Sequence, residues 1–294
     1  MGEWLPSTPP RTKDKKTMIQ KRIAIINDVS SFGRCSTAVI LPIVSHLGIQ
    51  GCPLPTALFS NHTGYDSFFR LDFTRFMRSY MDEWHKLGLL FDGIMTGFLG
   101  SEHQIDICRD FISEFSKPQT LAIIDPVMGD NGRIYSTYTP RMCKAMKRLI
   151  KDAHIITPNL TEACFLTETD YRPGGWHQQE LTDMIYRLRD MGANQIVITG
   201  IRMGTNFIGN AIMDAEGIVT FQRQQIIERI RSGTGDVFAS VLGADAVNGV
   251  PFEESVRRAS RFVRSSLLAS EKFDNQTPRD GICFEVALAK LKKA

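Results

Sequence analysis

The 294-residue chain carries 35 basic and 32 acidic side chains, a formal net charge of +3 and a hydrophobic content of 43%. This composition is typical of a globular protein with a large core, and the balanced charge argues against a nucleic-acid-binding or membrane-binding surface. The six cysteines are scattered without a Cys-x-x-Cys pair, and no run of 18 apolar residues occurs. We therefore expect reduced thiols, a cytoplasmic location, and neither nucleic acid nor membrane as a partner.

The first 17 residues are rich in Pro and Lys and lack the apolar centre of a secretion signal. Met18 directly precedes the first apolar run of the chain. We expect a disordered extension over residues 1–17 and a single domain over residues 18–294.

Short β-branched runs alternate with amphipathic helical segments along the rest of the chain. In chain order, strands are expected at Arg22–Asn27, Leu54–Phe59, Phe91–Gly97, Thr120–Asp125, His154–Thr157 and Gln195–Thr199. Helices are expected at Ser36–Leu47, Asp72–Leu87, Ser101–Phe115, Pro140–Lys151, Gln178–Met191, Thr234–Val247 and Phe252–Ser270, and an antiparallel hairpin at Phe207–Met213 and Gly217–Arg223. This order predicts an α/β fold with a central, mostly parallel sheet flanked by helices on both faces.

Gly233, Thr234, Gly235 and Asp236 form a Gly-Thr-Gly-Asp sequence that leads directly into an apolar helical segment. Two glycines allow a tight backbone turn, and the free N–H groups of a first helical turn attract phosphate. A carboxylate repels phosphate but can take a proton from a hydroxyl that attacks it, so Asp236 is a candidate general base for phosphoryl transfer. The alternative is that Asp236 only caps the helix.

Further carboxylates follow the predicted strands, at the sheet edge where parallel α/β proteins bind ligands. Asp125 ends the fourth predicted strand, and Asp130 and Glu162 follow it in the chain. An ATP-using enzyme holds Mg²⁺ through one or two such groups and phosphate oxygens, so these carboxylates are candidate metal ligands. The alternative is local, with Asp125 as a turn residue and Glu162 as the partner of Asn159 in a helix capping box.

The stretch Gly129–Gly132, followed by Arg133–Tyr138, has a glycine at each end and is expected to form a mobile flap that excludes water. Neither a Gly-x-x-x-x-Gly-Lys-[Ser/Thr] loop nor a Gly-x-Gly-x-x-Gly sequence after a strand occurs. The phosphate site is therefore expected at Gly233–Asp236.

Five separate segments carry the most specific pattern of the chain. They are Phe59-Ser-Asn-His-Thr-Gly-Tyr65, Thr96-Gly97, Asp125-Pro-Val-Met-Gly-Asp130, Ile156-Thr-Pro-Asn-Leu-Thr-Glu162 and Gly233-Thr-Gly-Asp236. In order and spacing they resemble the pyridoxal kinase family of the ribokinase-like superfamily, and the resemblance extends from about Ile23 to the C-terminus. It implies a ribokinase-like fold and ATP-dependent phosphorylation of the 5′-hydroxymethyl group of a vitamin B6 vitamer, with Mg²⁺ and a monovalent cation such as K⁺ as candidate cofactors.

The resemblance also implies roles for individual residues. Asp236 would be the base, and the amides of Gly233, Thr234 and Gly235 would hold the transferred phosphoryl group. The other implied site residues are Asp125, Thr157 and Glu162 around the metal, Asn159, Thr199, Gly200, Gly233 and Thr234 around ATP, and Asp28, Thr63, Tyr65 and Phe98 around the ring of the substrate. His62 is expected to orient its loop, and the expected partners are the vitamer, ATP and a second copy of the chain in a homodimer.

Some positions depart from the family pattern. Asn27-Asp28-Val29-Ser30 stands where many pyridoxal kinases have Gln-Ser-His, and Phe98 occupies a position often held by Tyr, so the preferred vitamer stays open. Asp28 together with Phe32–Cys35 is similar to the hydroxymethylpyrimidine kinases of thiamine synthesis, which makes that activity the main alternative. A sugar kinase and a non-catalytic protein that binds B6 or nucleotide are further alternatives. A sugar kinase usually has an early Gly-Gly-x-x-x-Asn block, and a non-catalytic protein would be expected to lose the base or the metal carboxylates.

Overall fold

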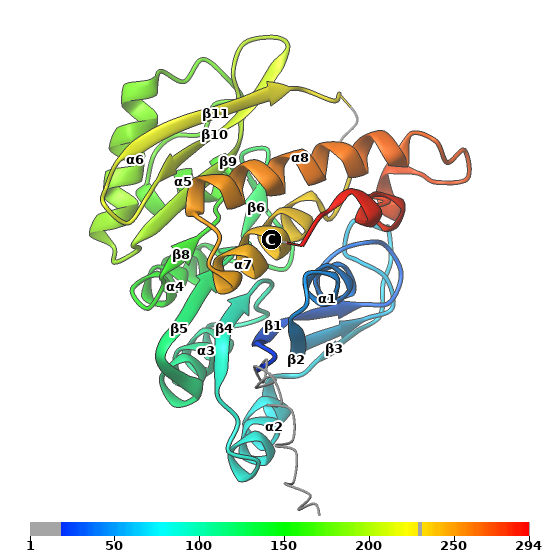
Figure 1. Cartoon of the computed structure of the whole chain (residues 1–294), viewed down its shortest axis with the longest axis vertical. Helices are drawn as coiled ribbons and strands as arrows, with labels where there is room; N and C mark the ends of the chain where they lie inside the picture. Colours follow the sequence, from blue (N-terminus) through cyan, green and yellow to red (C-terminus); the bar gives the residue numbers. More distant parts are fainter. Residues whose placement is uncertain (1–18, 229–230, 294) are drawn as a thin grey trace, which may run out of the picture.

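A nine-stranded sheet forms the centre of the fold (Figure 1). The computed structural model describes residues 19–228 and 231–293, so the extension expected at residues 1–17 lies outside the described residues. The strands are β1 Arg22–Ser30, β2 Gln50–Phe59, β3 Arg70–Asp72, β4 Phe91–Thr96, β5 Ser116–Ile124, β8 Ile155–Ile156, β9 Gln195–Arg202, β10 Phe207–Met213 and β11 Val219–Gln225. Their order across the sheet is β11-β10-β9-β8-β5-β4-β1-β2-β3.

The sheet is parallel at its centre and antiparallel at both edges. β1 pairs in parallel with β2 and β4, and the parallel pairing continues through β5, β8 and β9. β10 and β11 form the expected antiparallel hairpin, and the short β3, which the sequence did not predict, pairs antiparallel with Ala57–Phe59. β2 tolerates Pro53 and Pro55 because β3 does not reach that part of the strand, which leaves its outer edge unpaired.

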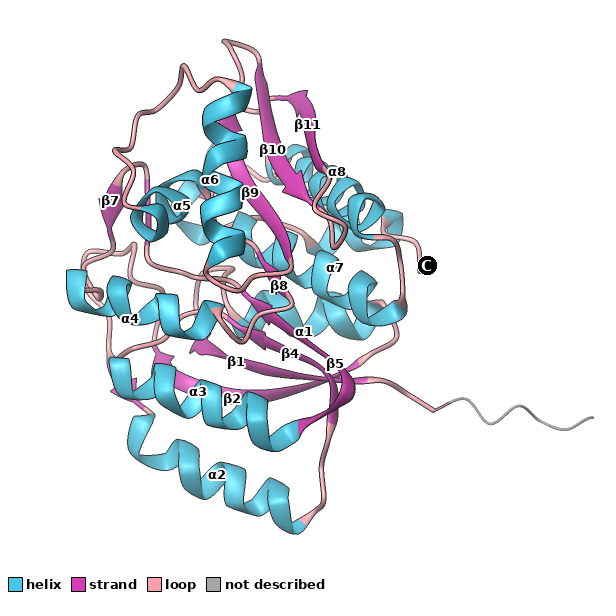
Figure 2. Cartoon of the chain, turned by 90° about the vertical axis from the view of Figure 1, so that its left-hand side faces the viewer, coloured by secondary structure: helices cyan, strands magenta, loops and turns pink. Residues whose placement is uncertain are grey.

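Helices cover both faces of the sheet, as predicted. They are α1 Thr37–His46, α2 Thr74–Lys86, α3 Glu102–Phe115, α4 Pro140–Ile150, α5 Leu160–Thr167, α6 Gln178–Asp190, α7 Thr234–Asn248 and α8 Phe252–Ser270, followed by two 3₁₀ turns at Pro278–Asp280 and Glu285–Lys290. Helices α2 to α6 lie on one face and α1, α7 and α8 on the other (Figure 2). The seven expected helices are confirmed to within a few residues at each end.

The central strands bury side chains on both faces. In β1, Ala24 and Ile26 point into the core under α2 to α6, whereas Ile23 and Ile25 point into the core under α1, α7 and α8. All four side chains are buried, because successive residues of a strand point to opposite faces. Within the described part of the chain, no helix has both the length and the apolar character needed to cross a membrane.

The expected flap is a small β-hairpin. β6 Gly129–Asp130 and β7 Arg133–Ile134 pair antiparallel, and the two residues between them, Asn131 and Gly132, have positive φ angles of 51° and 75°. Two successive positive φ angles are typical of the turns that join two-residue hairpins. The segment therefore has regular hydrogen-bonded structure, and its mobility stays a prediction.

Candidate active site

One large cavity of about 930 Å³ lies beyond the carboxyl ends of the parallel strands. Its wall includes the ends of β1, β4, β5 and β9, the β6–β7 hairpin, the N-terminus of α7 and one side of α8. Parallel α/β sheets place ligands at this edge. The cavity brings together all but one of the site residues predicted from the sequence: Asp28, Thr63, Phe98, Asp125, Thr157, Asn159, Glu162, Thr199, Gly200, Gly233, Thr234, Gly235 and Asp236.

The Gly233–Asp236 segment forms the start of α7. Gly233 has a positive φ of 82° and is the N-cap residue, and Thr234 is the first residue of the helix. A Cβ atom at Gly233 would overlap the carbonyl oxygen of Arg34, so both the backbone angle and the packing require glycine here. The N–H groups of the first helical turn have no intrahelical acceptor. Together with the positive end of the helix dipole, they lie at the cavity wall. We call Ser232–Asp236 the anion loop.

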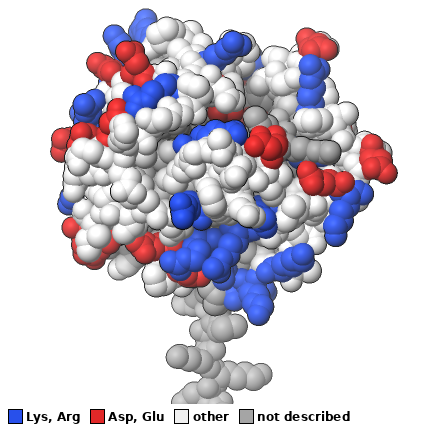
Figure 3. Space-filling model, turned by 90° about the horizontal axis from the view of Figure 1, so that it is seen from above, with Lys and Arg blue, Asp and Glu red and all other residues white. Residues whose placement is uncertain are grey.

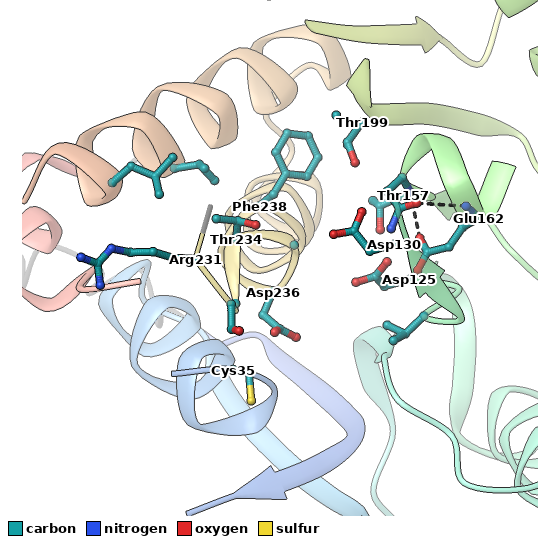
Figure 4. A pocket seen from close by; sticks show the side chains of 18 of the residues that line it. Cys35, Asp125, Asp130, Thr157, Glu162, Thr199, Arg231, Thr234, Asp236 and Phe238 are labelled. Carbon is teal, nitrogen blue, oxygen red and sulfur yellow. Dashed lines mark hydrogen bonds between the residues drawn. The ribbon is translucent and has the colours of Figure 1, made fainter. Parts of the chain in front are cut away.

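Asp236 points into the cavity from the anion loop, with Cys35 beside it (Figure 4). Burial raises the pKa of Asp236 to about 7, and the neighbouring charge of Asp28 adds to this effect, while hydrogen bonding from Ser36 and Asn27 opposes it. A carboxylate with a pKa near neutrality can accept a proton at physiological pH and release it afterwards. Burial also raises the pKa of Cys35 to about 12, so this thiol is protonated and is a poor nucleophile.

Asn27 holds the ends of β1 and β4 together at the cavity floor. Its Oδ1 accepts hydrogen bonds from the backbone N–H of Asp28 at 2.9 Å and of Phe98 at 2.8 Å. Gly97 permits this contact, because a Cβ atom at that position would overlap the Asn27 amide. The Asp28 carboxylate accepts a hydrogen bond from Ser30 Oγ at 2.9 Å, and burial raises its pKa. The Phe98 ring and the Asp28 carboxylate thus face the cavity from fixed positions.

Asp125 and Asp130 approach the cavity from the side opposite Asp236 (Figure 4). Burial and the nearby charge of Asp236 raise the pKa of Asp125. Thr157 Oγ1 is buried in the same wall, close enough to the Asp125 carboxylate to oppose the rise in its pKa. A carboxylate and a hydroxyl oxygen with spare lone pairs fit a Mg²⁺ ion that keeps water and phosphate oxygens as its other ligands. No cluster of three or more His, Cys, Asp or Glu suited to a metal occurs in the described ranges, which is compatible with such a sparse protein ligand set.

Glu162 is the third predicted metal residue, and its carboxylate caps α5. Glu162 Oε2 accepts from the backbone N–H of Asn159 at 2.8 Å, Asn159 Oδ1 accepts from the N–H of Glu162 at 2.9 Å, and Glu162 Oε1 accepts from Met128 N–H at 3.0 Å. The local alternative, a capping box, is therefore confirmed for both residues. Burial and the charge of Asp125 raise the pKa of Glu162. Because each carboxylate oxygen already accepts a backbone N–H, Glu162 is better suited to act through water than as a direct ligand.

The loop after β2 contributes Thr63 to the cavity wall. His62 orients this loop, as the sequence predicted: its Nδ1 accepts from Gly64 N–H at 3.0 Å, and its Nε2 donates to the carbonyl of Arg279. Tyr65 is not among the cavity-lining residues. Its hydroxyl donates to Asp280 Oδ1 at 2.6 Å, so this side chain lies against the C-terminal segment, outside the cavity wall.

The wall between the anion loop and β9 is the predicted nucleotide side. Thr199 pairs with Asn159 across a parallel bridge, which sets Thr199 and Gly200 beside the N-terminus of α5. Three arginines on one side of α8, namely Arg257, Arg261 and Arg264, also line the cavity. Basic side chains gather toward one side of the molecule when it is seen from above (Figure 3).

Sequence reasoning missed several residues that form the site. The cavity is also lined by Cys35, Ser36, Tyr135, Arg231 and Phe238. Ser36 has a positive φ of 56°, which no sequence pattern announces for a serine. Arg231 stands directly before the anion loop, and this position alone was a signal that could have been used.

A family model for phosphomethylpyrimidine kinase matches residues 41–278. A Schizosaccharomyces pombe protein provisionally named pyridoxal kinase is 29% identical over 210 residues, which cover 64% of this chain and 57% of that protein. A pyridoxine/pyridoxal/pyridoxamine kinase of Bordetella avium is 26% identical, with 83% of each chain covered. A hydroxymethylpyrimidine/phosphomethylpyrimidine kinase of Rhizobium meliloti is 21% identical, covering 80% of this chain and 85% of that protein.

Solved structures show the same relationship. A crystal structure with pyridoxal of a Bacteroides thetaiotaomicron protein, provisionally named a phosphomethylpyrimidine kinase, is 36% identical with a TM-score of 0.89 and covers 93% of this chain and 96% of its own. The pyridoxal kinase of Lactobacillus plantarum is 25% identical with a TM-score of 0.84, covering 92% and 96%. The chain therefore belongs to the phosphomethylpyrimidine kinase family, and it is a pyridoxal kinase-like enzyme with the ribokinase-like fold.

Proposed function

We propose that this kinase transfers the γ-phosphoryl group of ATP to the 5′-hydroxymethyl group of a B6 vitamer, pyridoxal, pyridoxine or pyridoxamine. One observation carries the proposal: the Asp236 carboxylate, with a pKa of about 7, lies at a helix N-terminus in the same cavity as Asp28, Thr63 and Phe98. The base, the phosphate-binding amides and a pocket suited to a polar aromatic ring thus share one space.

The proposed reaction is an in-line displacement. Asp236 accepts the proton of the substrate hydroxyl while the hydroxyl oxygen forms a bond to the γ-phosphorus, and the bond to ADP breaks. The amides of Gly233, Thr234 and Gly235 stabilise the charge that develops on the transferred group. Asp125 and Thr157 would hold Mg²⁺, which neutralises phosphate charge when it is bound, and Glu162 would act through water. Thr199, Gly200 and Asn159 would lie along the nucleotide.

The ring of the substrate would lie against Phe98, between Asp28 and Thr63. A pyridine ring with a phenolic oxygen offers hydrogen-bond partners to both polar side chains, whereas an aminopyrimidine lacks that oxygen. Sites built on such hydrogen bonds discriminate strongly against analogues that leave a buried partner unpaired. We therefore expect a B6 vitamer to be preferred over hydroxymethylpyrimidine.

Competition kinetics test this choice, with pyridoxal and hydroxymethylpyrimidine offered together and both products quantified. We expect Thr63→Val to lower kcat/KM for pyridoxal by about 10-fold or more and to change KM for ATP by less than about 3-fold. Thr205→Val, at an exposed loop position, serves as the matched control. Preferential phosphorylation of the pyrimidine would overturn the B6 assignment and support the second candidate, hydroxymethylpyrimidine kinase, which the family match favours.

A requirement for K⁺, assembly as a homodimer and a cytoplasmic location belong to the same proposal. Activity titrations with K⁺ against Na⁺, sedimentation of the purified chain and microscopy of the tagged protein test these three points in turn.

A further inference from the structure

We propose that Arg231 is a positioning residue that holds the anion loop in its phosphate-binding shape by anchoring it to the C-terminal end of α8 and to the segment Thr277–Cys283. We call that segment the C-terminal clasp. The inference adds a residue to the proposed kinase reaction and rests on the anion loop binding the transferred phosphoryl group.

Among the described residues, the hydrogen bonds of the Arg231 side chain go to backbone carbonyl groups, and its Nε is buried without a partner. The residue is 4% exposed, and its Nη1 donates to the carbonyl oxygens of Thr277 at 3.0 Å and Gly281 at 3.4 Å. Its Nη2 donates to the carbonyl oxygen of Ser270 at 3.4 Å. One guanidinium therefore joins α8 to both ends of the turn at Pro278–Asp280.

The positive charge of Arg231 is balanced by dipoles. No acidic side chain pairs with it within the described ranges, and Ser270 is the last residue of α8. The carbonyl groups at a helix C-terminus carry partial negative charge and favour a cation. A buried cation held by three carbonyl groups fixes the direction of the chain that carries it, because each lost contact leaves a buried polar group unpaired.

Arg231 directly precedes the anion loop, and the backbone of the loop is hydrogen-bonded to the same C-terminal clasp. Ser232 accepts a hydrogen bond at its carbonyl oxygen from Ile282 N–H at 3.1 Å. The Arg231 side chain extends away from Asp236 in the cavity wall (Figure 4). This direction suits a residue that acts on the loop and does not touch the reacting atoms.

The C-terminal clasp also supports the ring side of the cavity. Asp280 accepts from Arg34 N–H at its carbonyl oxygen, at 3.1 Å, and from the Tyr65 hydroxyl at its carboxylate. Gly233 and Gly281 both have positive φ angles and both pack on the Arg34 backbone so closely that a Cβ atom would overlap it. The anion loop, the loop after β1 and the clasp therefore meet backbone to backbone. Two arginine side chains also reach the clasp, Arg231 from the anion-loop side and Arg34 from the loop after β1.

Loss of this anchor should affect the transition state more than the bound substrates. The amides of the anion loop contribute most when the transferred group carries its developing charge, and displacement of such groups by about 1 Å can cost about 100-fold in rate. We expect Arg231→Met to lower kcat by about 10- to 100-fold, with KM for the vitamer changed by less than about 3-fold. Arg231→Lys keeps the cation and N–H donors but loses the planar guanidinium fork, so it should recover only part of the kcat lost in the Met variant.

Arg279→Met is the matched control, because this arginine lies in the clasp itself and, among the described residues, its side chain is held by an exposed ion pair with Asp66. It should leave kcat unchanged. A second measurement needs no ring substrate: binding of MgADP with and without aluminium fluoride, which occupies the place of the transferred phosphoryl group. Arg231→Met should weaken the aluminium fluoride complex by about 10-fold or more and leave the affinity for MgADP alone within about 3-fold.

The proposal is overturned if Arg231→Met keeps the parent kcat, or if it lowers the affinity for MgADP equally with and without aluminium fluoride. It is also overturned if kcat of Arg231→Lys is as low as kcat of the Met variant. If Arg231→Met does not fold, Arg231→Gln, with one neutral N–H donor group, should show the same selective loss to a smaller degree, and an equal loss for both ligands would overturn the proposal. Failure of the B6 assignment leaves the fluoride experiment unaffected, so the two outcomes are distinguishable.

Discussion

At the scale of single residues, Asp236 is the proposed general base, and its burial carries a cost for the stability of the fold. Its pKa of about 7 means that roughly half of the molecules carry the active carboxylate at neutral pH. We expect kcat to rise with pH between about 6 and 8 as this group loses its proton, and Asp236→Asn to lower kcat by about 100-fold or more with little change in ATP affinity. Steady-state kinetics across this pH range check both; near-normal turnover of the Asn variant would leave Asp236 with a capping role only.

The same residue should limit stability. The folded-state pKa lies above the ordinary value of 3.8, so between pH 4 and pH 7 the folded state keeps a proton that the unfolded chain has lost, and stability falls as pH rises. The penalty is about 2 kcal/mol above pH 7, after allowance for solvent screening. Asp236→Asn should therefore raise Tm at pH 8, with the difference vanishing near pH 4. An equal Tm for both proteins at pH 8 would contradict this account.

Asp125 and Glu162 were predicted from the sequence as equivalent metal residues, and their contacts now separate them. Asp125→Asn should raise the Mg²⁺ concentration for half-maximal activity by about 10-fold with little change in Tm. Glu162→Gln should instead lower the free energy of unfolding by about 1–3 kcal/mol, because an NH₂ group replaces an oxygen that accepts a backbone N–H. Mg²⁺ titrations and thermal melts of both variants check the contrast, and a reversed pattern would show that Glu162 is the main ligand.

At the scale of elements, the β6–β7 hairpin depends on Gly132. This residue has a φ of 75°, and a Cβ atom there would overlap the Tyr171 ring. Gly132→Ala should distort the hairpin and admit water, so that the ratio of ATP hydrolysis to phosphoryl transfer rises by about 3-fold or more. Coupled assays with and without the vitamer measure that ratio. Gly174→Ala, at a position with open space around the added Cβ, should leave it unchanged.

Most elements were predictable because their signals are local. The apolar runs of β1, β4 and β5 reveal the type of these elements, and the periodicity of α2, α4 and α8 reveals both type and length. The strands β1 and β5 are longer than predicted, at Arg22–Ser30 and Ser116–Ile124. The three-residue β3 lacks any such period and forms only because β2 offers it an edge. The capping residues of α5 were recognised, but its apolar sequence hid the helix that they begin. The residues of the candidate site that belong to sequence motifs were predicted. Ser36 was missed because its place depends on residues far along the chain, such as Asp236, and the sequence signal for Arg231 was its position directly before the anion loop.

At the scale of the whole molecule, one sheet serves two cores. Ile25 and Ile26 are neighbours in β1 but belong to different cores. A substitution that disturbs the core on one face of the sheet therefore also disturbs the strand against which the core on the opposite face packs. We expect Ile25→Ala and Ile26→Ala each to lower Tm, with residues 19–293 still unfolding in a single transition by circular dichroism and tryptophan fluorescence. Two separated transitions would show that the cores unfold independently, against the single domain expected from the sequence.

The meeting of Arg34 with Gly233 and Gly281 has a consequence for the protein during its synthesis. During synthesis Arg34 emerges from the ribosome long before residue 281 has been added, and domains begin to fold from the end that emerges first. The sheet through β9 can pair while the support of the anion loop is still missing. A nascent chain would therefore pair its central strands before the anion loop is supported, and a chain cut short after α8 would lack both that support and the buried core side chains of Ile282 and Phe284.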